Sequence, residues 1–380
     1  MCGISGSIVK SRFDREDLIK KTLSLMRRRG PDNRSHFKLK YNDKVLNLLH
    51  TRLNIIDINK RSNQPMTIGE FTLIFNGEIY NYIELRKKLK LKNYSFETNS
   101  DTEVLLKSYI EYGENCVNHF NGMWAFAIWN NKKKKLFISR DIFGEKPLYY
   151  HLSDKGFFFG SEIKFIKSLS NESFKVNKEH INKNLFYGYK SLCKNNETFF
   201  DKIYSLENST NITIDLNLNL IKRKFWSPKI NIDNRLQEKT ASNEVKRLLQ
   251  KSLNLRMRSD VPIAFCLSGG IDSGLLVSLA NKKFHKKVST FSIIDQDYRY
   301  NERKNINLIL DDLKCDNLKI FLKKKKNLFF KRLKELTNYH DGPISTISYY
   351  IHSFLSEEIS KKGYKVAISG TGADEIFTGY

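Results

Sequence analysis

The feature that most constrains this fold is a short apolar stretch, a turn with two adjacent glycines, and a second apolar stretch. Residues 263–267 are apolar and too few for a helix, so they predict a buried strand, and residues 275–280 predict a helix beyond the turn. Gly269 and Gly270 permit a tight turn and let the backbone approach an anion closely. The first N–H groups of the helix can donate to phosphate oxygens, as can two serines, Ser268 and Ser273. A strand, a glycine turn and a helix in this order predict a phosphate-binding site.

The glycine turn is not a Walker A loop, because no Gly-Lys-Ser or Gly-Lys-Thr follows the glycines. The sequence Ser-Gly-Gly-Ile-Asp-Ser at 268–273 resembles instead the PP-loop of the ATP pyrophosphatases, which cleave ATP between its α- and β-phosphates and leave an adenylate. This resemblance implies ATP and Mg²⁺ as cofactors, with Asp272 on the metal, since a bare carboxylate would repel a phosphate. The simpler interpretation is an ordinary glycine turn ahead of a helix.

Length and composition limit the class of protein. A chain of 380 residues has room for two ordinary domains. No apolar run is long enough to span a membrane and the first residues lack the pattern of a signal peptide, so we expect a cytoplasmic location and no membrane partner. The cysteines are odd in number and widely spaced, which predicts neither a disulfide framework nor a zinc site. They are Cys2, Cys116, Cys193, Cys266 and Cys315, and all but the first are expected to be inert.

The formal net charge of +25 raises the question of a nucleic-acid partner. Lys, Asn and Ile are abundant along the whole chain, a pattern that an A/T-rich coding sequence alone produces. Two runs of four lysines, at 132–135 and 323–326, lack interleaved aromatic residues and predict a hairpin turn and a solvated surface segment. We therefore expect no nucleic-acid partner. The alternative of another class is a basic nucleic-acid-binding protein with a degenerate ATPase-like domain.

The two halves of the chain carry different patterns of apolar residues. In the amino-terminal half, short apolar or alternating runs predict strands, and longer segments with apolar residues three or four apart predict helices, so we expect two sheets enclosed by helices. The strands are expected at 5–9, 45–49, 71–76, 124–129, 135–140 and 156–160, and the helices at 15–28, 81–89 and 101–111. Past residue 241, strands alternate with helices. This alternation predicts a doubly wound sheet whose ligand lies beyond the carboxyl ends of the strands.

Cys2 is the first candidate for catalysis. Because its side chain is small, Met1 should be removed, which leaves a thiol and an α-amine on one residue. An α-amine has a pKa of about 7.7–8.0 and can act as the base for the thiol near neutral pH. A cysteine at position 2 carries little weight by itself, so this interpretation depends on the segments that follow.

Six segments resemble, in the expected order, the class II glutamine amidotransferase domain of the asparagine synthetases. They begin with Cys-Gly-Ile-Ser-Gly at 2–6 and end with Arg-Asp-Ile-Phe-Gly-Glu-Lys-Pro-Leu-Tyr-Tyr at 140–150, and the others lie at 28–32, 50–57, 76–81 and 100–103. The resemblance implies an α+β domain, an Ntn-type αββα sandwich, in which Cys2 attacks the side-chain amide of glutamine. The glutamine site that it implies consists of Arg52, Leu53, Asn54, Ile55, Ile56, Asn76, Gly77, Glu78 and Asp101.

Each implied role agrees with the chemistry of its residue, but each residue could also have a purely structural role. Arg52 would pair with the α-carboxylate of glutamine, and Glu78 and Asp101 would accept hydrogen bonds from its ammonium group. The Asn76 amide and the Gly77 N–H, in what the resemblance implies is an oxyanion loop, would donate to the oxyanion. The alternatives are a surface cation for Arg52, a hairpin turn for Asn76 and Gly77, and a helix N-cap for Asp101.

The carboxy-terminal half is similar to the synthetase domain of the same family, and the resemblance implies Asp374 as a second Mg²⁺ ligand. The ATP site that it implies consists of Leu267, Ser268, Gly269, Gly270, Asp272, Ser273, Ile293, Ser369 and Gly370. The expected organisation is a glutaminase domain over 1–215, a linker over 216–240 and a PP-loop α/β domain over 241–380. We expect the last of these to be incomplete, since the family continues beyond the point where this chain ends. A homodimer is a further expectation.

The resemblance implies glutamine-dependent synthesis of asparagine from aspartate, with ATP cleaved to AMP and diphosphate. Thr371 departs from the family pattern, which has Ser-Gly-Glu-Gly-Ala-Asp-Glu where this chain has Ser-Gly-Thr-Gly-Ala-Asp-Glu. The missing carboxylate is associated with the adenylate intermediate, and a threonine hydroxyl cannot act as a base near neutral pH. The alternative is the same two-step reaction on another carboxylate acceptor, such as a sugar acid.

Overall fold

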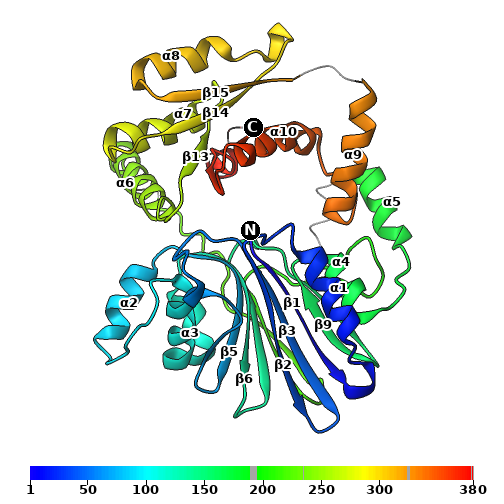
Figure 1. Cartoon of the computed structure of the whole chain (residues 1–380). Helices are drawn as coiled ribbons and strands as arrows, with labels where there is room; N and C mark the ends of the chain where they lie inside the picture. The colour runs from blue at the N-terminus through cyan, green and yellow to red at the C-terminus, as the bar shows by residue number, and fades with distance from the viewer. Residues whose placement is uncertain (189–194, 234, 323–325, 378, 380) are drawn as a thin grey trace. The chain divides into compact units, whose positions relative to one another are not determined.

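The chain forms two compact units in the computed structural model, which describes residues 1–188, 195–233, 235–322, 326–377 and 379 (Figure 1). The first unit comprises Met1–Ile230 with His340–Gly342, and the second comprises Asn231–Tyr339 with Pro343–Tyr380. Cys193 and most of the second lysine run lie outside the described residues. None of the described helices is both long enough and apolar enough to cross a membrane.

The first sheet of the first unit has the strand order β10-β8-β9-β1-β3-β2, and all its neighbours pair antiparallel. Its strands are β1 (Gly3–Lys10), β2 (Asn33–Tyr41), β3 (Lys44–Arg52), β8 (Tyr149–Ser153), β9 (Gly156–Gly160) and β10 (Tyr204–Ser205). β1 pairs with both β3 and β9, so it lies in the interior of the sheet. Cys2 immediately precedes this interior strand.

The second sheet is also antiparallel, with the order β12-β11-β7-β6-β5-β4. Its strands are β4 (Met66–Ile68), β5 (Phe71–Ile79), β6 (Gly122–Asn130), β7 (Lys135–Arg140), β11 (Thr210–Asp215) and β12 (Leu220–Lys224). The turn between β6 and β7 carries the first lysine run, so the predicted hairpin turn is confirmed. β12 lies within the stretch expected to be a linker, and the predicted domain boundaries stay a prediction.

Strand β6 explains why the two sheets stack and why helices cover them. Its side chains alternate between faces, as in any strand: Ala125, Ala127 and Trp129 belong to the core between the two sheets, whereas Trp124, Phe126 and Ile128 belong to the core beneath helices. Since both faces of β6 are apolar, both must be covered.

The helices of the first unit lie on the outer faces of the two sheets (Figure 1). α1 (Glu16–Met26) and α4 (Ile163–Ser170) pack on the first sheet, and α2 (Tyr82–Lys90) and α3 (Asp101–Tyr112) pack on the second. The layers therefore follow the order helix, sheet, sheet, helix, which is the two sheets enclosed by helices that the sequence predicts. The unit also contains α5 (Lys178–Tyr187).

The second unit is an α/β structure around a four-stranded parallel sheet with the order β15-β14-β13-β16. The strands are β13 (Ile263–Cys266), β14 (Ser289–Ile294), β15 (Asp316–Phe321) and β16 (Val366–Ile368). Residues of α6 (Glu238–Arg256), α7 (Ile271–Ser278) and α8 (Arg303–Leu313) share one apolar core with the sheet, and residues of α10 (Ile347–Lys361) share the other. Helices on both faces of a parallel sheet agree with the predicted doubly wound arrangement. The unit also contains α9 (Lys326–His340) and α11 (Ala373–Phe377).

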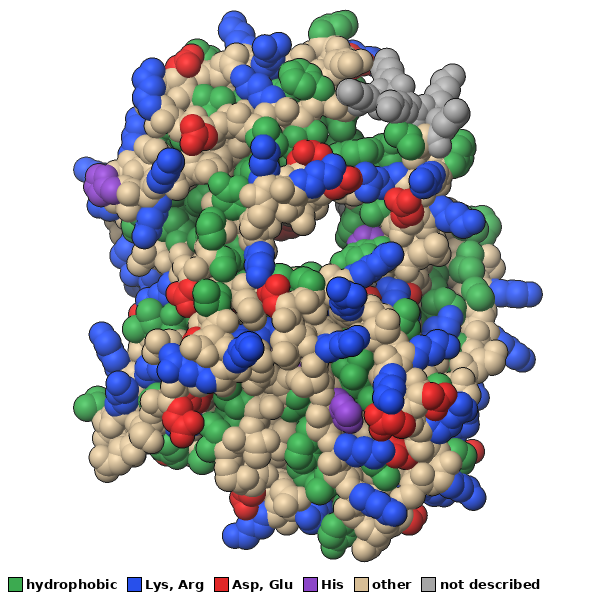
Figure 2. All heavy atoms as spheres, viewed as in Figure 1, with side chains coloured by type: hydrophobic (Ala, Val, Ile, Leu, Met, Phe, Trp, Pro, Cys, Tyr) green, Lys and Arg blue, Asp and Glu red, His purple; other side chains and the backbone are tan. Residues whose placement is uncertain are grey.

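Figure 2 shows how the basic residues are distributed on one face of the molecule. Lysine and arginine side chains are spread across this face and lie among acidic and apolar side chains. The high net charge is thus distributed over this face and not gathered into one block.

Candidate functional site

The thiol and the backbone of Cys2 are both held by neighbouring groups. Leu53 N–H donates to the sulfur at 3.4 Å, and the thiol lies 3.8 Å from the Leu53 carbonyl, to which it donates. Arg29 Nε donates to the Cys2 carbonyl at 2.9 Å, and its guanidinium also pairs with Glu162 at 3.0 Å. Burial raises the pKa of the Cys2 thiol, so its nucleophilic form requires a base close by.

The amine that precedes Cys2 is also buried. In the full chain this amine belongs to Met1, and burial, with the nearby charges of Arg29 and Lys146, lowers its pKa to about 6. A neutral amine is the form that accepts a proton. The environment of the amino terminus therefore suits an amine that acts as a base near neutral pH.

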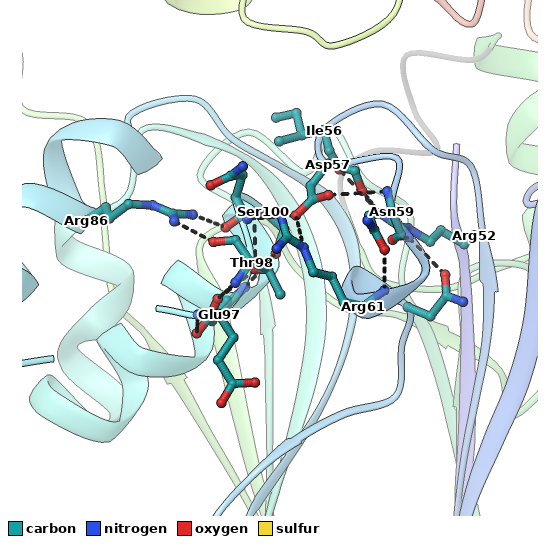
Figure 3. Close-up of polar contacts among 12 residues, drawn as sticks. Arg52, Ile56, Asp57, Asn59, Arg61, Arg86, Glu97, Thr98 and Ser100 are labelled. Atoms are coloured by element: carbon teal, nitrogen blue, oxygen red, sulfur yellow. Dashed lines mark hydrogen bonds and ion pairs between the residues drawn. The ribbon is translucent and has the colours of Figure 1, made fainter. Parts of the chain in front are cut away.

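Arg52 ends β3 and organises the loop that follows. The whole residue is 4% exposed. One terminal nitrogen donates to the Asn59 carbonyl and to Asn63 Oδ1, both at 2.9 Å, and the other donates to the carbonyls of Ile56, at 3.3 Å, and Asp57 (Figure 3). Because these bonds occupy both terminal nitrogens, an end-on bidentate pair with a substrate carboxylate requires two of them to be exchanged, and a side-on pair through Nε requires one. Arg52 thus supplies positive charge and fixes the loop.

Asn76 and Gly77 lie in strand β5, and the expectation that they occupy a loop is wrong. The strand continues through Ile79, and Asn76 and Gly77 pair with Ala125 and Trp124 of β6. Gly77 makes this pairing possible, because a Cβ there would lie 2.1 Å from the Met123 carbonyl oxygen. The Asn76 side chain is 1% exposed, and within the described part of the chain neither its oxygen nor its nitrogen has a hydrogen-bond partner. A buried amide without a partner is a group that a ligand can satisfy.

Glu78 and Asp101 form a buried acidic pair. Burial and the negative charge of Asp101 raise the pKa of Glu78 to about 7. Burial raises the pKa of Asp101 to about 6, although the Ile79 N–H donates to its carboxylate at 3.0 Å. Ser100, not Asp101, is the N-cap of α3, since its hydroxyl accepts from the Glu103 N–H. The alternative of Asp101 as an N-cap is therefore wrong, and its carboxylate is available for a ligand cation.

Lys146 is part of this cluster, although nothing in the sequence indicates a role for it. It is buried, and burial lowers its pKa while the neighbouring Glu78 acts to raise it. Its ammonium lies 3.2 Å from the sulfur of Met1. Nothing in the local sequence, a lysine between Glu145 and Pro147, indicates burial.

The other residues of the expected glutamine site also lie in the loop around Arg52. The Asn54 N–H donates to the Asp32 carboxylate at 2.8 Å, which ties the loop to the segment after α1. Ile55 follows it, and the Ile56 carbonyl accepts from Arg52. The first unit thus brings together the loop after Arg52, the Cys2 thiol and the guanidinium of Arg52.

The glycine turn of the second unit follows β13 and leads into α7, as predicted. The hydroxyls of Ser268 and Ser273 hydrogen-bond to each other at 2.8 Å, and the Gly270 N–H donates to Ser268 Oγ at 3.2 Å. The Gly269 N–H donates to the carboxylate of Glu302 at 3.0 Å. Glu302, which the sequence analysis did not select, therefore places a negatively charged oxygen on an N–H group that a phosphate would use.

The second glycine turn lies against the first. A Cβ on Gly370 would lie 3.0 Å from the Cβ of Asp272 and 3.0 Å from the Ser273 nitrogen. The turns meet because they follow β13 and β16, which pair in parallel with Phe265 opposite Ile368. Leu267, at the first turn, is buried, and Ile293 lies in the adjacent β14.

The polar residues of the second turn are more exposed. The hydroxyl of Ser369 donates to that of Thr371 at 3.1 Å, and Asp374 begins the short helix α11. The described residues contain no group of three or more His, Cys, Asp or Glu side chains that could hold a metal. The carboxylates of Asp272 and Asp374 are the type of oxygen ligand that Mg²⁺ prefers.

The two units match two family models. Residues 1–226 match a glutamine amidotransferase domain, and residues 244–380 match asparagine synthase. A protein of Methanocaldococcus jannaschii named as a candidate glutamine-hydrolysing asparagine synthetase is 33% identical over the whole of this chain and 76% of its own length. The chain belongs to the family of glutamine-hydrolysing asparagine synthetases.

Other relatives of the chain differ in their length and in their names. Asparagine synthetase 1 of Bacillus subtilis is 33% identical over the whole chain, which spans 59% of its length. A Gibberella zeae protein named amidase chry2 is 26% identical, again over the whole chain and 59% of its own length. A solved structure of glutamine phosphoribosylpyrophosphate amidotransferase from Bacillus subtilis matches 87% of this chain and 70% of its own chain. Its 13% sequence identity and TM-score of 0.44 are too low to decide the fold.

Proposed function

We propose that this member of the asparagine synthetase family transfers ammonia from glutamine to a carboxylate that it activates with ATP. The first unit, as an Ntn-type hydrolase, releases the ammonia, and the second, as a PP-loop enzyme, forms the acyl-adenylate. The observation that carries the proposal is the buried group of charges at the amino terminus. The charges of Arg52 and Asp101 act on the Cys2 thiol, and those of Glu78 and Lys146 act on the adjacent amine.

In the first reaction, Met1 is removed and the α-amine of Cys2 takes the proton of its own thiol. The thiolate attacks the side-chain amide carbon of glutamine, and the carbonyl oxygen becomes an oxyanion. The unpaired Asn76 amide and the Gly77 N–H are the donors for this oxyanion. Ammonia then leaves with a proton from the amine, and water hydrolyses the thioester to glutamate.

Glu78 and Asp101 bind the α-ammonium group of glutamine in this proposal. Both carboxyls have raised pKa values, about 7 and about 6, so both are ionised at slightly alkaline pH and become protonated as the pH falls. Since only a carboxylate attracts an ammonium group, glutamine binding should be strong above pH 7 and weaken as the pH falls through the two pKa values. Because folding raises the pKa values of both carboxyls, each favours the folded apo-protein in its protonated form. The stability that Glu78 and Asp101 contribute is therefore present at low pH and is lost as the pH rises through the two pKa values.

A pH titration of glutamine binding tests this assignment. A Cys2→Ala variant binds glutamine without turning it over. Its Kd should rise about tenfold per pH unit as the pH falls from about 7 to about 6, where Glu78 becomes protonated, and more steeply below about pH 6, where Asp101 becomes protonated as well. An Asp101→Asn variant should bind glutamine more weakly at high pH, and its Kd should change less with pH. Calorimetry at several pH values measures both, and a Kd that does not change over this range contradicts the assignment.

In the second reaction, the PP-loop and the second glycine turn hold ATP as its Mg²⁺ complex. Asp272 and Asp374 would hold the Mg²⁺, which when bound neutralises the charge of the departing diphosphate. Leu267, Ile293, Ser369 and Gly370 would border the adenosine, while the serines and N–H groups of the turn donate to phosphate oxygens. The carboxylate acceptor attacks the α-phosphate, diphosphate leaves, and ammonia then displaces AMP.

Aspartate is the acceptor that we propose, because the family matches and the named relatives are asparagine synthetases. Another carboxylate is the second candidate. Thr371 favours it because this hydroxyl cannot replace a carboxylate base, and a relative that matches the whole chain carries the name of an amidase.

An exchange experiment on the full chain decides between these acceptors. Radioactive diphosphate should enter ATP in the presence of Mg²⁺ only when the correct acceptor is added, so aspartate is compared with other carboxylic acids. We expect aspartate to stimulate exchange most. If only another acid stimulates exchange, the proposed mechanism stands and the acceptor is that acid. If no acid stimulates exchange in a protein that binds ATP, the proposed adenylation is contradicted.

A further inference from the structure

One carboxylate joins two segments that lie far apart in the sequence. Asp57, which is 6% exposed, accepts from the Asn99 N–H at 2.7 Å through Oδ2, although the two residues are 42 positions apart. Its other oxygen, Oδ1, accepts from the Asn59 N–H at 3.2 Å, and Arg61 Nε lies 3.5 Å from Oδ2. Figure 3 shows Asp57 on the loop after Arg52, beside the segment before α3.

Each of these segments carries one charge of the proposed glutamine site. The backbone carbonyl of Asp57 accepts from the guanidinium of Arg52, the expected partner of the α-carboxylate. Asn99, which donates to the Asp57 side chain, is two residues before Asp101, the expected partner of the α-ammonium group. A single residue therefore connects the cation of the site to its anion.

The segment before α3 is fixed independently of Asp57. The carboxylate of Glu103 accepts from the N–H groups of Glu97 at 3.0 Å and Thr98 at 2.7 Å. Arg86 donates to the carbonyls of Thr98 and Ser100 (Figure 3). Because this segment is already held on its own helix, the contact at Asp57 positions the loop of Arg52 against it.

Asp57 must be ionised to make all of these contacts. Burial alone would raise its pKa, but hydrogen bonds from Asn99, Ser62 and Asn59 together with nearby Arg61 hold the pKa of Asp57 below its usual range. A carboxylate can accept through both oxygens, whereas an amide would direct N–H groups at one of the donors.

We propose that Asp57 is a positioning residue that sets the separation of Arg52 and Asp101 and thereby the recognition of the α-amino acid end of glutamine. The inference rests on the proposed glutaminase function. It implies that loss of the contact between Asp57 and Asn99 weakens the recognition of substrates that bind both Arg52 and Asp101 more than that of substrates that bind only one of them. The kinetic consequence is a change in substrate discrimination and in KM, with a small change in kcat.

The test compares Asp57→Asn with the unaltered protein on two substrates, L-glutamine and glutaramate, which lacks the α-amino group. Asparagine has nearly the same shape and also tolerates the left-handed backbone of this position, φ 47°, so the substitution removes charge without backbone strain. We expect KM for L-glutamine to rise about tenfold or more, as for a lost hydrogen bond to a charged group, with kcat changed only a few-fold. The preference for L-glutamine over glutaramate, as a ratio of kcat/KM values, should fall.

Asp215→Asn is the matched control. Asp215 also accepts from two backbone N–H groups, those of Asn217 at 2.8 Å and Asn219 at 3.0 Å, but in the hairpin turn between β11 and β12. This variant should retain both KM and the preference. Asp57→Glu, which keeps the charge, should recover part of the preference and serves as the test variant if Asp57→Asn does not fold.

An unchanged preference in Asp57→Asn would overturn the proposal, whether or not the melting temperature falls, because a purely structural role weakens both substrates alike. Failure of the proposed function looks different. In that case the unaltered protein, after removal of Met1, hydrolyses neither substrate.

Discussion

Replacing Cys2 with alanine is expected to abolish glutamine hydrolysis and to leave amide synthesis from ammonium salts intact. The reason is that the thiol forms the covalent intermediate, and no second nucleophile takes its place in the mechanism. Removing the nucleophile of a serine protease lowers kcat by roughly 10⁶-fold, so a loss of at least about 10³-fold is expected here. Glutamate release measures the first reaction, and amide formation with added ammonium chloride measures the second.

The control for this variant is Cys315→Ser. Cys315 is a free, half-buried thiol of the second unit, and burial raises its pKa, so it tests whether any cysteine substitution lowers the rate. It should hydrolyse glutamine at the rate of the unaltered protein. Persistent glutamine hydrolysis by the Cys2→Ala variant would refute the assignment of Cys2 as the nucleophile. Loss of ammonia-dependent synthesis in a folded Cys2→Ala protein would show that the two reactions are not separable.

The sequence predicts strands with a locally apolar pattern better than strands that are defined only by their pairing partners. β7 and β9 coincide with their predicted ranges, and β6 differs only at its ends, because interior strands are apolar runs whose pattern is visible locally. β2 and β15 were not predicted. Both are edge strands with mixed polar residues, and pairing with β3 and β14, not their own composition, makes them strands.

The candidate sites show the same limit. The motif residues Cys2 and Arg52 could be selected because the segments that carry them resemble those of a known family. The positions of Glu302 on the Gly269 N–H and of Asp57 on the Asn99 N–H could not, since each joins a carboxylate to a backbone group more than 30 residues away. The resemblance implies an oxyanion loop at Asn76 and Gly77, and the alternative for Asn-Gly is a hairpin turn, but the Gly77 backbone pairs with β6 at a distance that excludes a side chain.

Replacing Asp272 with asparagine is expected to abolish ATP–diphosphate exchange and to spare glutamine hydrolysis. Asp272 lies in the first turn of α7, directly after the first glycine turn, and Gly370 of the second glycine turn packs against it. The proposed Mg²⁺ needs the negative charge of this carboxylate, and an amide does not supply it. The fold should survive, because a carboxylate in the first turn of a helix contributes only about 0.3–1 kcal/mol through the helix dipole.

The matched control is Asp311→Asn, which removes an exposed carboxylate from α8 of the same unit and should leave exchange unchanged. Binding of ATP with and without Mg²⁺, measured by calorimetry, separates the role of the metal from that of the turn. If Asp272 acts through Mg²⁺, the variant loses the Mg²⁺-dependent part of the affinity and keeps the part that the N–H groups provide. If exchange persists in Asp272→Asn, the carboxylate does not hold the metal, and the phosphate site would depend on the backbone and serines of the turn alone.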